Sequence, residues 1–264
     1  AANFRICARM LSRRHILAGL CSCAFCQPGQ AESSAKGGCY LTADEFKTLT
    51  DGSKESFDYA FSGFDKRRRS GDPDFDKALA ITLLKLTDTF QILPDFMFYQ
   101  EKGSSMNAVA TGSIERRDRP DGAVAYGLNL LGLQKQGELG GIPGVIAVCA
   151  HEFGHVVQMK RGTRAKLVTA SGQVYRNELH ADYLAGYFVG LKKLENTTFP
   201  AAEVALAVYS LGDSSFESRG HHGTREQRGE AVRQGFLRSH RDHASFDEAF
   251  ESGFKYAQSI KRAG

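Results

Sequence analysis

The chain has 264 residues, of which 42% are hydrophobic and 24% charged, a balance typical of a globular protein with a substantial core. Its formal charge of +4 comes from residues 1–31, which hold four arginines and no acidic residue, whereas the other 30 basic and 30 acidic residues cancel. The basic character of the whole chain therefore gives no reason to expect a nucleic-acid partner.

Residues 1–31 resemble an export signal of the twin-arginine type. Ser12-Arg13-Arg14-His15-Ile16-Leu17 carries the paired arginines, an apolar stretch follows from Ile16 to Phe25, and Gly29-Gln30-Ala31 offers a small-x-small cleavage site. The apolar stretch is too short to cross a bilayer, and no longer one follows. We therefore expect a protein exported to the bacterial periplasm, with one domain over residues 32–264 and no membrane span.

Four of the six cysteines lie within the first 31 residues, which leaves Cys39 and Cys149. In an oxidising compartment these two could form one disulfide. Cys149 ends the apolar run Val145-Ile146-Ala147-Val148-Cys149, which favours a buried apolar role for it instead.

The pattern from residue 32 onward predicts an α+β chain in which a few strands are followed by a helical remainder. Residues 32–40 are small and polar, as in a linker. Thr42 and Glu45 predict a capping box at the start of a helix over 41–64. Short strands are expected at 96–99, 108–114 and 123–131. Apolar spacing predicts further helices over 74–91, 141–160, 176–194, 200–211, 224–236 and 245–260.

The strongest local signal is His151-Glu152-Phe153-Gly154-His155. On a helix, two histidines four positions apart lie on one face, where both imidazoles can bind one zinc ion. Glu152 is then expected beside the metal as general base and acid, taking a proton from zinc-activated water and passing it to the leaving amine. Gly154 would let another backbone or a substrate approach closely. The alternative is a chance occurrence in an ordinary helix.

A second pair of residues completes the expected site. A catalytic zinc ion takes three protein ligands and keeps one position open. Glu178 and Asp182 are again four apart on one helical face. We expect Glu178 to be the third ligand, and Asp182 to accept a hydrogen bond from a ligand histidine. A solvated helix face is the alternative for both residues.

Other residues of the same predicted helix have different expected roles. His180 points away from the metal-binding face and is expected to be structural. Ala181, Ala185 and Gly186 are small, which would let this helix lie close against the helix of the two histidines.

These motifs resemble the glutamate-ligand branch of the HExxH zinc peptidases, the gluzincins. Residues 106–112 and 128–131, followed by the zinc helix, are similar to the core of Ste24/HtpX-like peptidases. Residues 178–186 and 222–228 are similar to the neutral zinc metallopeptidase family. The resemblance implies a zincin-like α+β domain, mostly helical, with a small sheet whose edge strand, over Ala123–Leu131, precedes the zinc helix and could bind an extended peptide.

Related folds also imply a histidine or tyrosine that follows the third ligand and stabilises the oxyanion. His222, in Gly220-His221-His222-Gly223-Thr224, is the first choice, with a surface turn or a helix cap as the alternative. Tyr126, Tyr175 and Arg228 are weaker options.

The sequence therefore predicts an exported zinc peptidase that acts on a protein or peptide substrate. One zinc ion per chain would be bound by His151, His155 and Glu178. The competing prediction is a zinc-binding but catalytically weak module that binds proteins or acts as a chaperone. The intact Glu152 favours the enzyme, because the proposed proton transfers depend on its carboxylate.

Overall fold

The computed structural model describes residues 39–50, 70–103, 106–114, 116–210 and 220–261. The predicted export signal, residues 1–31, lies outside the described residues. So do residues 32–38 of the predicted linker and residues 51–64 of the first predicted helix.

A small three-stranded sheet forms one part of the fold. Its strands are β1 (Asp95–Tyr99), β2 (Ala108–Thr111) and β3 (Ala123–Gly127), in the spatial order β1-β3-β2. β3 pairs in parallel with β1 and antiparallel with β2. All residues of the three strands are buried, which suits their small and aromatic side chains.

The prediction that the edge strand spans Ala123–Leu131 is wrong. β3 is the central strand, because hydrogen-bonded neighbours lie on both of its sides. It ends at Gly127, and helix α3 (Leu128–Lys135) begins at once. The carboxylate of Glu101 accepts hydrogen bonds from the backbone N–H groups of Asn129 and Leu130 and so caps the start of this helix. An edge of the sheet lies at β2 instead.

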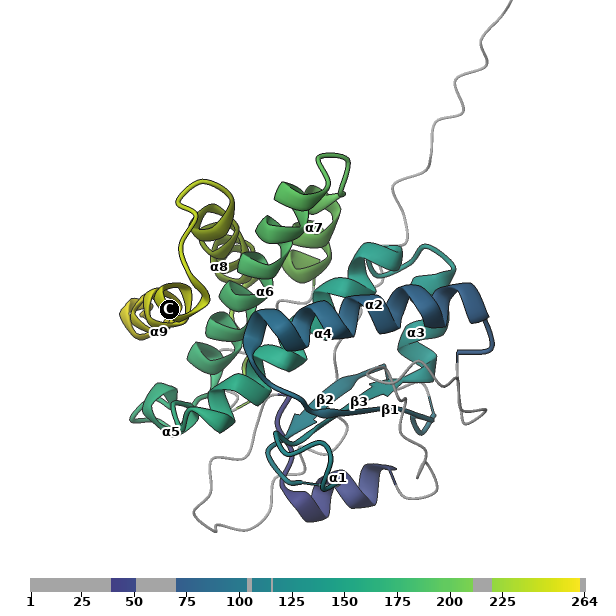
Figure 1. Cartoon of the computed structure of the whole chain (residues 1–264). Coiled ribbons are helices and arrows are strands. Elements are labelled where there is room, and N and C mark those ends of the chain that lie inside the picture. The colour runs from purple at the N-terminus through teal and green to yellow at the C-terminus, as the bar shows by residue number, and fades with distance from the viewer. Residues whose placement is uncertain (1–38, 51–69, 104–105, 115, 211–219, 262–264) are drawn as a thin grey trace, which may run out of the picture.

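Helices cover both faces of the sheet (Figure 1). On one face lies α1 (Ala43–Thr50), whose buried Phe46 packs with side chains of all three strands. The capping box predicted for this helix is present, with the Thr42 N–H donating to the Glu45 carboxylate at 2.9 Å and the Glu45 N–H donating to the Thr42 hydroxyl at 3.4 Å. On the other face lie α2 (Pro73–Phe90), α3 and α4 (Gly141–Lys160), in the main apolar core.

The second half of the chain is helical, as expected. It contains α5 (Arg164–Leu167), α6 (Tyr175–Glu195), α7 (Ala201–Ser210), α8 (Arg225–His240) and α9 (Phe246–Ser259), which gather beside α4 in Figure 1. The α+β class is confirmed. None of the helices in the described part of the chain has both the length and the apolar character needed to cross a membrane.

Small residues set the distances between the central helices. A Cβ at Gly154 of α4 would lie 3.1 Å from Cα of Ala181 in α6, so these two helices cross almost backbone to backbone, as predicted. Gly186 was expected to face α4 too, but this expectation is wrong. A Cβ there would collide with the backbone carbonyl of Val232 in α8. The absence of a side chain at Gly186 therefore lets α6 and α8 pack closely.

Candidate metal centre

Helix α4 brings the first two predicted ligands into the protein interior. Its apolar residues bury the helix between the sheet and α6, so the polar residues of the motif are carried inside with it. His151, Glu152 and His155 are all buried, at 4%, 2% and 2% exposure. Nε2 of His151 and Nε2 of His155 face each other at 3.1 Å. Because the motif occupies one continuous helix, its geometry follows from the spacing in the sequence.

Glu178 of α6 completes a triangle of donor atoms. Its Oε2 lies 3.2 Å from Nε2 of His151 and 3.5 Å from Nε2 of His155. Ligands placed tetrahedrally at zinc-like distances of 2.0–2.1 Å are separated from one another by about 3.3 Å. The three atoms therefore have the spacing of three corners of one coordination tetrahedron, and the residues fit a metal ion of this kind.

A fourth donor comes from a distant part of the sequence. The Sγ of Cys39 joins the two histidines and Glu178 in a cluster whose ligand atoms all lie within 4.8 Å of one another. The backbone N–H of Cys39 also donates to Oε1 of Glu178 at 3.4 Å. Within the described residues this is the cluster that could hold a metal ion. Cys149 is a free and fully buried thiol, so the disulfide between the two cysteines is not formed.

Asp182 contacts the ring nitrogen of His151 that faces away from the other donor atoms, as expected. Its Oδ1 lies 2.8 Å from Nδ1 of His151, which leaves Nε2 of that ring directed at the other ligands. Arg228 of α8 donates from Nε to Oδ2 of Asp182 at 2.7 Å and from Nη2 to Oδ1 at 2.8 Å. Arg228 was a weak candidate for oxyanion binding. In the structure it forms a buried bidentate ion pair with Asp182, which orients the Asp182 carboxylate.

The second histidine has a supporting residue that the sequence analysis missed. Nδ1 of His155 lies 3.0 Å from Oε1 of Gln158, whose Nε2 donates to the backbone carbonyl of Asn177 at 2.8 Å. The available signal was the spacing of three residues along α4, which places Gln158 beside His155 on the helix surface. Gln158 thus links the orientation of this ring to the first turn of α6.

The charges of neighbouring residues favour the ionised forms of two carboxyl groups of the site, those of Glu178 and Asp182. Burial opposes the charged form of Glu178, but the neighbouring His155 and His151 hold the pKa of Glu178 well below its ordinary value. Burial likewise opposes ionisation of Asp182, and Arg228 outweighs it, so the pKa of Asp182 is lowered. For His151, burial acts to lower the pKa, but Asp182 and Glu178 raise it to about 10. Such an environment of anionic donors around a histidine suits a bound cation.

Glu152 differs from the ligands around it. Its Oε2 is buried and has no hydrogen-bond partner among the described residues. Burial is the main influence that raises the pKa of this carboxyl above its ordinary value. This carboxyl group is buried, has one oxygen without a hydrogen-bond partner among the described residues and lies next to the donor cluster, so it is placed to act as a proton acceptor.

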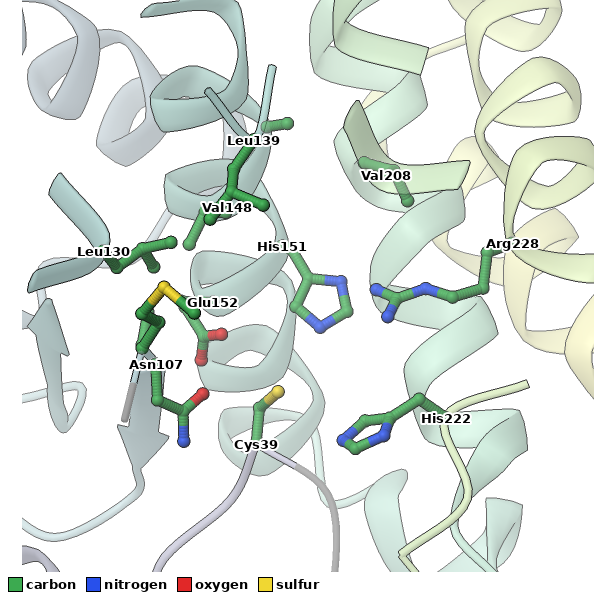
Figure 2. A pocket seen from close by; sticks show the side chains of 13 residues that line it. Cys39, Asn107, Leu130, Leu139, Val148, His151, Glu152, Val208, His222 and Arg228 are labelled. Atoms are coloured by element: carbon green, nitrogen blue, oxygen red, sulfur yellow. The ribbon is translucent and has the colours of Figure 1, made fainter. Parts of the chain in front are cut away.

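A pocket beside the cluster is lined by two of its members, Cys39 and His151, and by residues from distant segments of the chain (Figure 2). His151 and Glu152 lie on one side, and His222 and Arg228 approach from the other, with Cys39 at the base of the view. His222 therefore lies in the wall of the site, where its proximity also lowers the pKa of Glu178. The remainder of the wall is largely apolar and includes Met106, Leu130, Leu139, Ala147, Val148 and Val208.

Three other predicted residues lie elsewhere. The hydroxyl of Tyr126 donates to Oε1 of Gln134 inside the core, and the hydroxyl of Tyr175 donates to the carbonyl of Ile260. Neither tyrosine lines the pocket. His180 is structural in position, since it is fully buried and its Nε2 lies 3.2 Å from the carbonyl oxygen of Phe250 in α9.

Comparison of the chain with models of protein families, with curated proteins and with solved structures found no match in any of the three.

Proposed function

We propose that this protein is a zinc-dependent peptidase with a zincin-like domain, in which His151, His155 and Glu178 bind one zinc ion. The observation that carries the proposal is the triangle of donor atoms at 3.1, 3.2 and 3.5 Å beside the buried carboxyl group of Glu152. Two histidines and one carboxylate are a recurrent ligand set of catalytic zinc. The supporting contacts of Asp182 and Gln158 are of the type that orients such ligands.

Each residue has a distinct task in this proposal. A bound zinc ion supplies Lewis acidity, which polarises a peptide carbonyl and makes water more acidic. Glu152 takes the proton from the attacking water and gives it to the departing amine. Asp182 keeps His151 in one tautomer, and Arg228 keeps Asp182 ionised and fixed. His222, in the wall of the pocket, would donate a hydrogen bond to the developing oxyanion.

The pocket and the sheet edge suggest the class of substrate. A peptide in extended conformation can bind to an exposed strand by main-chain hydrogen bonds, and β2 is the strand at the edge of the sheet next to the pocket. The apolar wall formed with Val148 and Val208 would accept an apolar side chain beside the cleaved bond. We therefore propose that the substrate is an unfolded or extended protein segment with an apolar residue at that position.

The test compares wild type with Glu152→Gln. We expect the variant to bind one zinc ion per chain and to lose at least a thousandfold in the rate of peptide hydrolysis, because the amide keeps the shape of the carboxylate but cannot accept the proton. Metal content and cleavage of a library of apolar peptides are measured together. Glu251→Gln, a change at an exposed carboxylate, is the matched control. Absence of zinc in carefully prepared wild type, or full hydrolysis by Glu152→Gln, would overturn the proposal.

One observation favours the competing function, a metal-binding module with little turnover. Four donors rather than three converge at the centre, and a closed set of four protein ligands is typical of structural zinc. The same measurements separate the two, since such a module would bind zinc and hydrolyse nothing, whichever residue stands at position 152.

A further inference from the structure

The segment that carries Cys39 lies along the sheet edge that a substrate would need. The backbone carbonyl of Cys39 accepts a hydrogen bond from the N–H of Ala110 at 2.9 Å, and the N–H of Leu41 donates to the carbonyl of Ala110 at 3.0 Å. Tyr40 thereby forms a parallel bridge with Ala110, in the middle of β2. The chain itself has added an extended segment to the edge strand.

Two side-chain contacts hold this segment in place. The guanidinium of Arg164 lies over the ring of Tyr40, with its carbon 3.8 Å from the ring centroid. Leu41 packs against the apolar cluster that α1 forms with the sheet. These contacts hold the two residues that follow Cys39, whose thiol is one of the four clustered donors.

Cys39 offers a fourth donor atom beside the three candidate ligands. His151, His155 and Glu178 provide three corners of a tetrahedron, and Sγ of Cys39 lies within 4.8 Å of each of their donor atoms. Thiolate sulfur is a strong zinc ligand, and four protein ligands leave no position for substrate or water. The same short segment therefore blocks both the metal and the edge strand.

We propose that Cys39 is the fourth metal ligand and that residues 39–41 are an autoinhibitory segment, which holds the peptidase at low activity until it leaves the edge of β2. This inference rests on the proposed function. It also accounts for the four-donor cluster without making the centre purely structural. The backbone hydrogen bonds at Ala110 lie at the edge of the sheet, where contacts can open locally while the core elements stay folded.

Cobalt(II) provides a direct test, because thiolate bound to cobalt absorbs strongly in the near ultraviolet. The full-length chain is used with Cys7, Cys21, Cys23 and Cys26 changed to serine, so that Cys39 and Cys149 are its cysteines. We expect one cobalt ion and the thiolate band in this protein and in the control Cys149→Ala. Cys39→Ala should keep the cobalt ion and lose the band. When loaded with zinc it should hydrolyse peptides at least tenfold faster than the parent.

A second variant covers the case in which Cys39→Ala does not fold. Tyr40→Ala keeps the thiol but removes the contact with Arg164. In the metal-loaded protein, alkylation of Cys39 by iodoacetamide, mapped by mass spectrometry, should be slow in the parent and several-fold faster in Tyr40→Ala. Hydrolysis should rise in parallel. Equal alkylation rates in the two proteins would overturn the inference.

The outcomes also separate this inference from the proposed function. One bound cobalt ion without a thiolate band, and equal hydrolysis in parent and Cys39→Ala, would overturn the role of Cys39 while the peptidase stands. A band that disappears in Cys39→Ala, with parent and variant hydrolysing peptides at the same measurable rate, would overturn the autoinhibition, whereas no hydrolysis by either protein would overturn the proposed function. If the parent binds no metal, both the proposed function and this inference fail.

Discussion

At the scale of single residues, the candidate site consists of residues whose donor atoms face one another and of residues behind them that hold the donors in place. His151, His155 and Glu178 present the donor atoms, and Asp182 and Gln158 hold the two rings from behind. The ring of a ligand histidine can rotate and change its tautomer unless its other nitrogen is engaged. The precision of the donor triangle therefore depends on residues that do not touch the metal.

Replacing Asp182 by asparagine should weaken zinc binding by about 10- to 100-fold, because the contact that orients His151 loses its charge. It also leaves Arg228 buried without its anionic partner, so the free energy of unfolding of the metal-free protein should fall by about 3 kcal/mol or more. Zinc affinity is measured by competition with a chelating dye, and stability by urea denaturation. Asp88→Asn, at an exposed position of α2, is the control. An affinity equal to wild type would mean that Asp182 does not orient the ligand.

At the scale of the elements, the site depends on how closely three helices approach. Glu178 and Asp182 lie on α6, which contacts α4 through Gly154 and α8 through Gly186 and Gly235. The crossing with α4 brings Glu178 to the histidines, and the crossing with α8 brings Arg228 to Asp182. Glycine at these crossings removes the side chain that would keep the backbones apart.

Gly186→Ala tests this packing. Its Cβ would collide with the backbone carbonyl of Val232, so we expect the free energy of unfolding to fall by about 1–3 kcal/mol and zinc affinity to weaken as Arg228 moves away from Asp182. The matched control is Gly132→Ala in α3, where a Cβ would meet nothing within 4 Å. That change should raise stability by about 0.5–1 kcal/mol through helix propensity. Urea midpoints for both variants decide the question, and equal midpoints would contradict the crossing.

At the scale of the whole molecule, the candidate metal centre joins parts of the chain that are far apart in sequence. It connects α4, α6 and the segment before α1, and so links the sheet half of the fold to the helical half (Figure 1). Donor atoms from separate segments come together only in the folded chain, so a bound metal ion stabilises the folded state by an amount that grows with the logarithm of its affinity.

Removal of the metal should therefore lower the melting temperature of the whole domain. With free zinc at 100 times its dissociation constant, binding contributes about 2.7 kcal/mol to stability. We expect the melting temperature of wild type to rise with zinc concentration and to fall with a chelator. Glu178→Ala should respond much less to either. Calorimetric scans at several zinc concentrations provide the measurement, and a melting temperature independent of zinc in wild type would argue against a metal centre.

Much of this description follows from local sequence. The helices of the second half and the capping box at Thr42 and Glu45 depend on contacts within a few turns of the chain, and the apolar run that ends at Cys149 indicates its burial. The spacing of His151 and His155, and of Glu178 and Asp182, places each pair on one helical face for the same reason. The α+β class and a candidate metal centre could therefore be predicted without a structure.

The tertiary structure decided what lies between distant segments. The order of the strands depends on which strands pair. A short buried run of small residues such as β3 has the same sequence pattern at the centre of a sheet and at its edge. The partnership of Arg228 with Asp182 and the approach of Gly186 to α8 depend on a helix crossing that no local pattern encodes. Cys39 is separated from Glu178 by 139 positions, so its place at the metal centre exists only once the chain is folded.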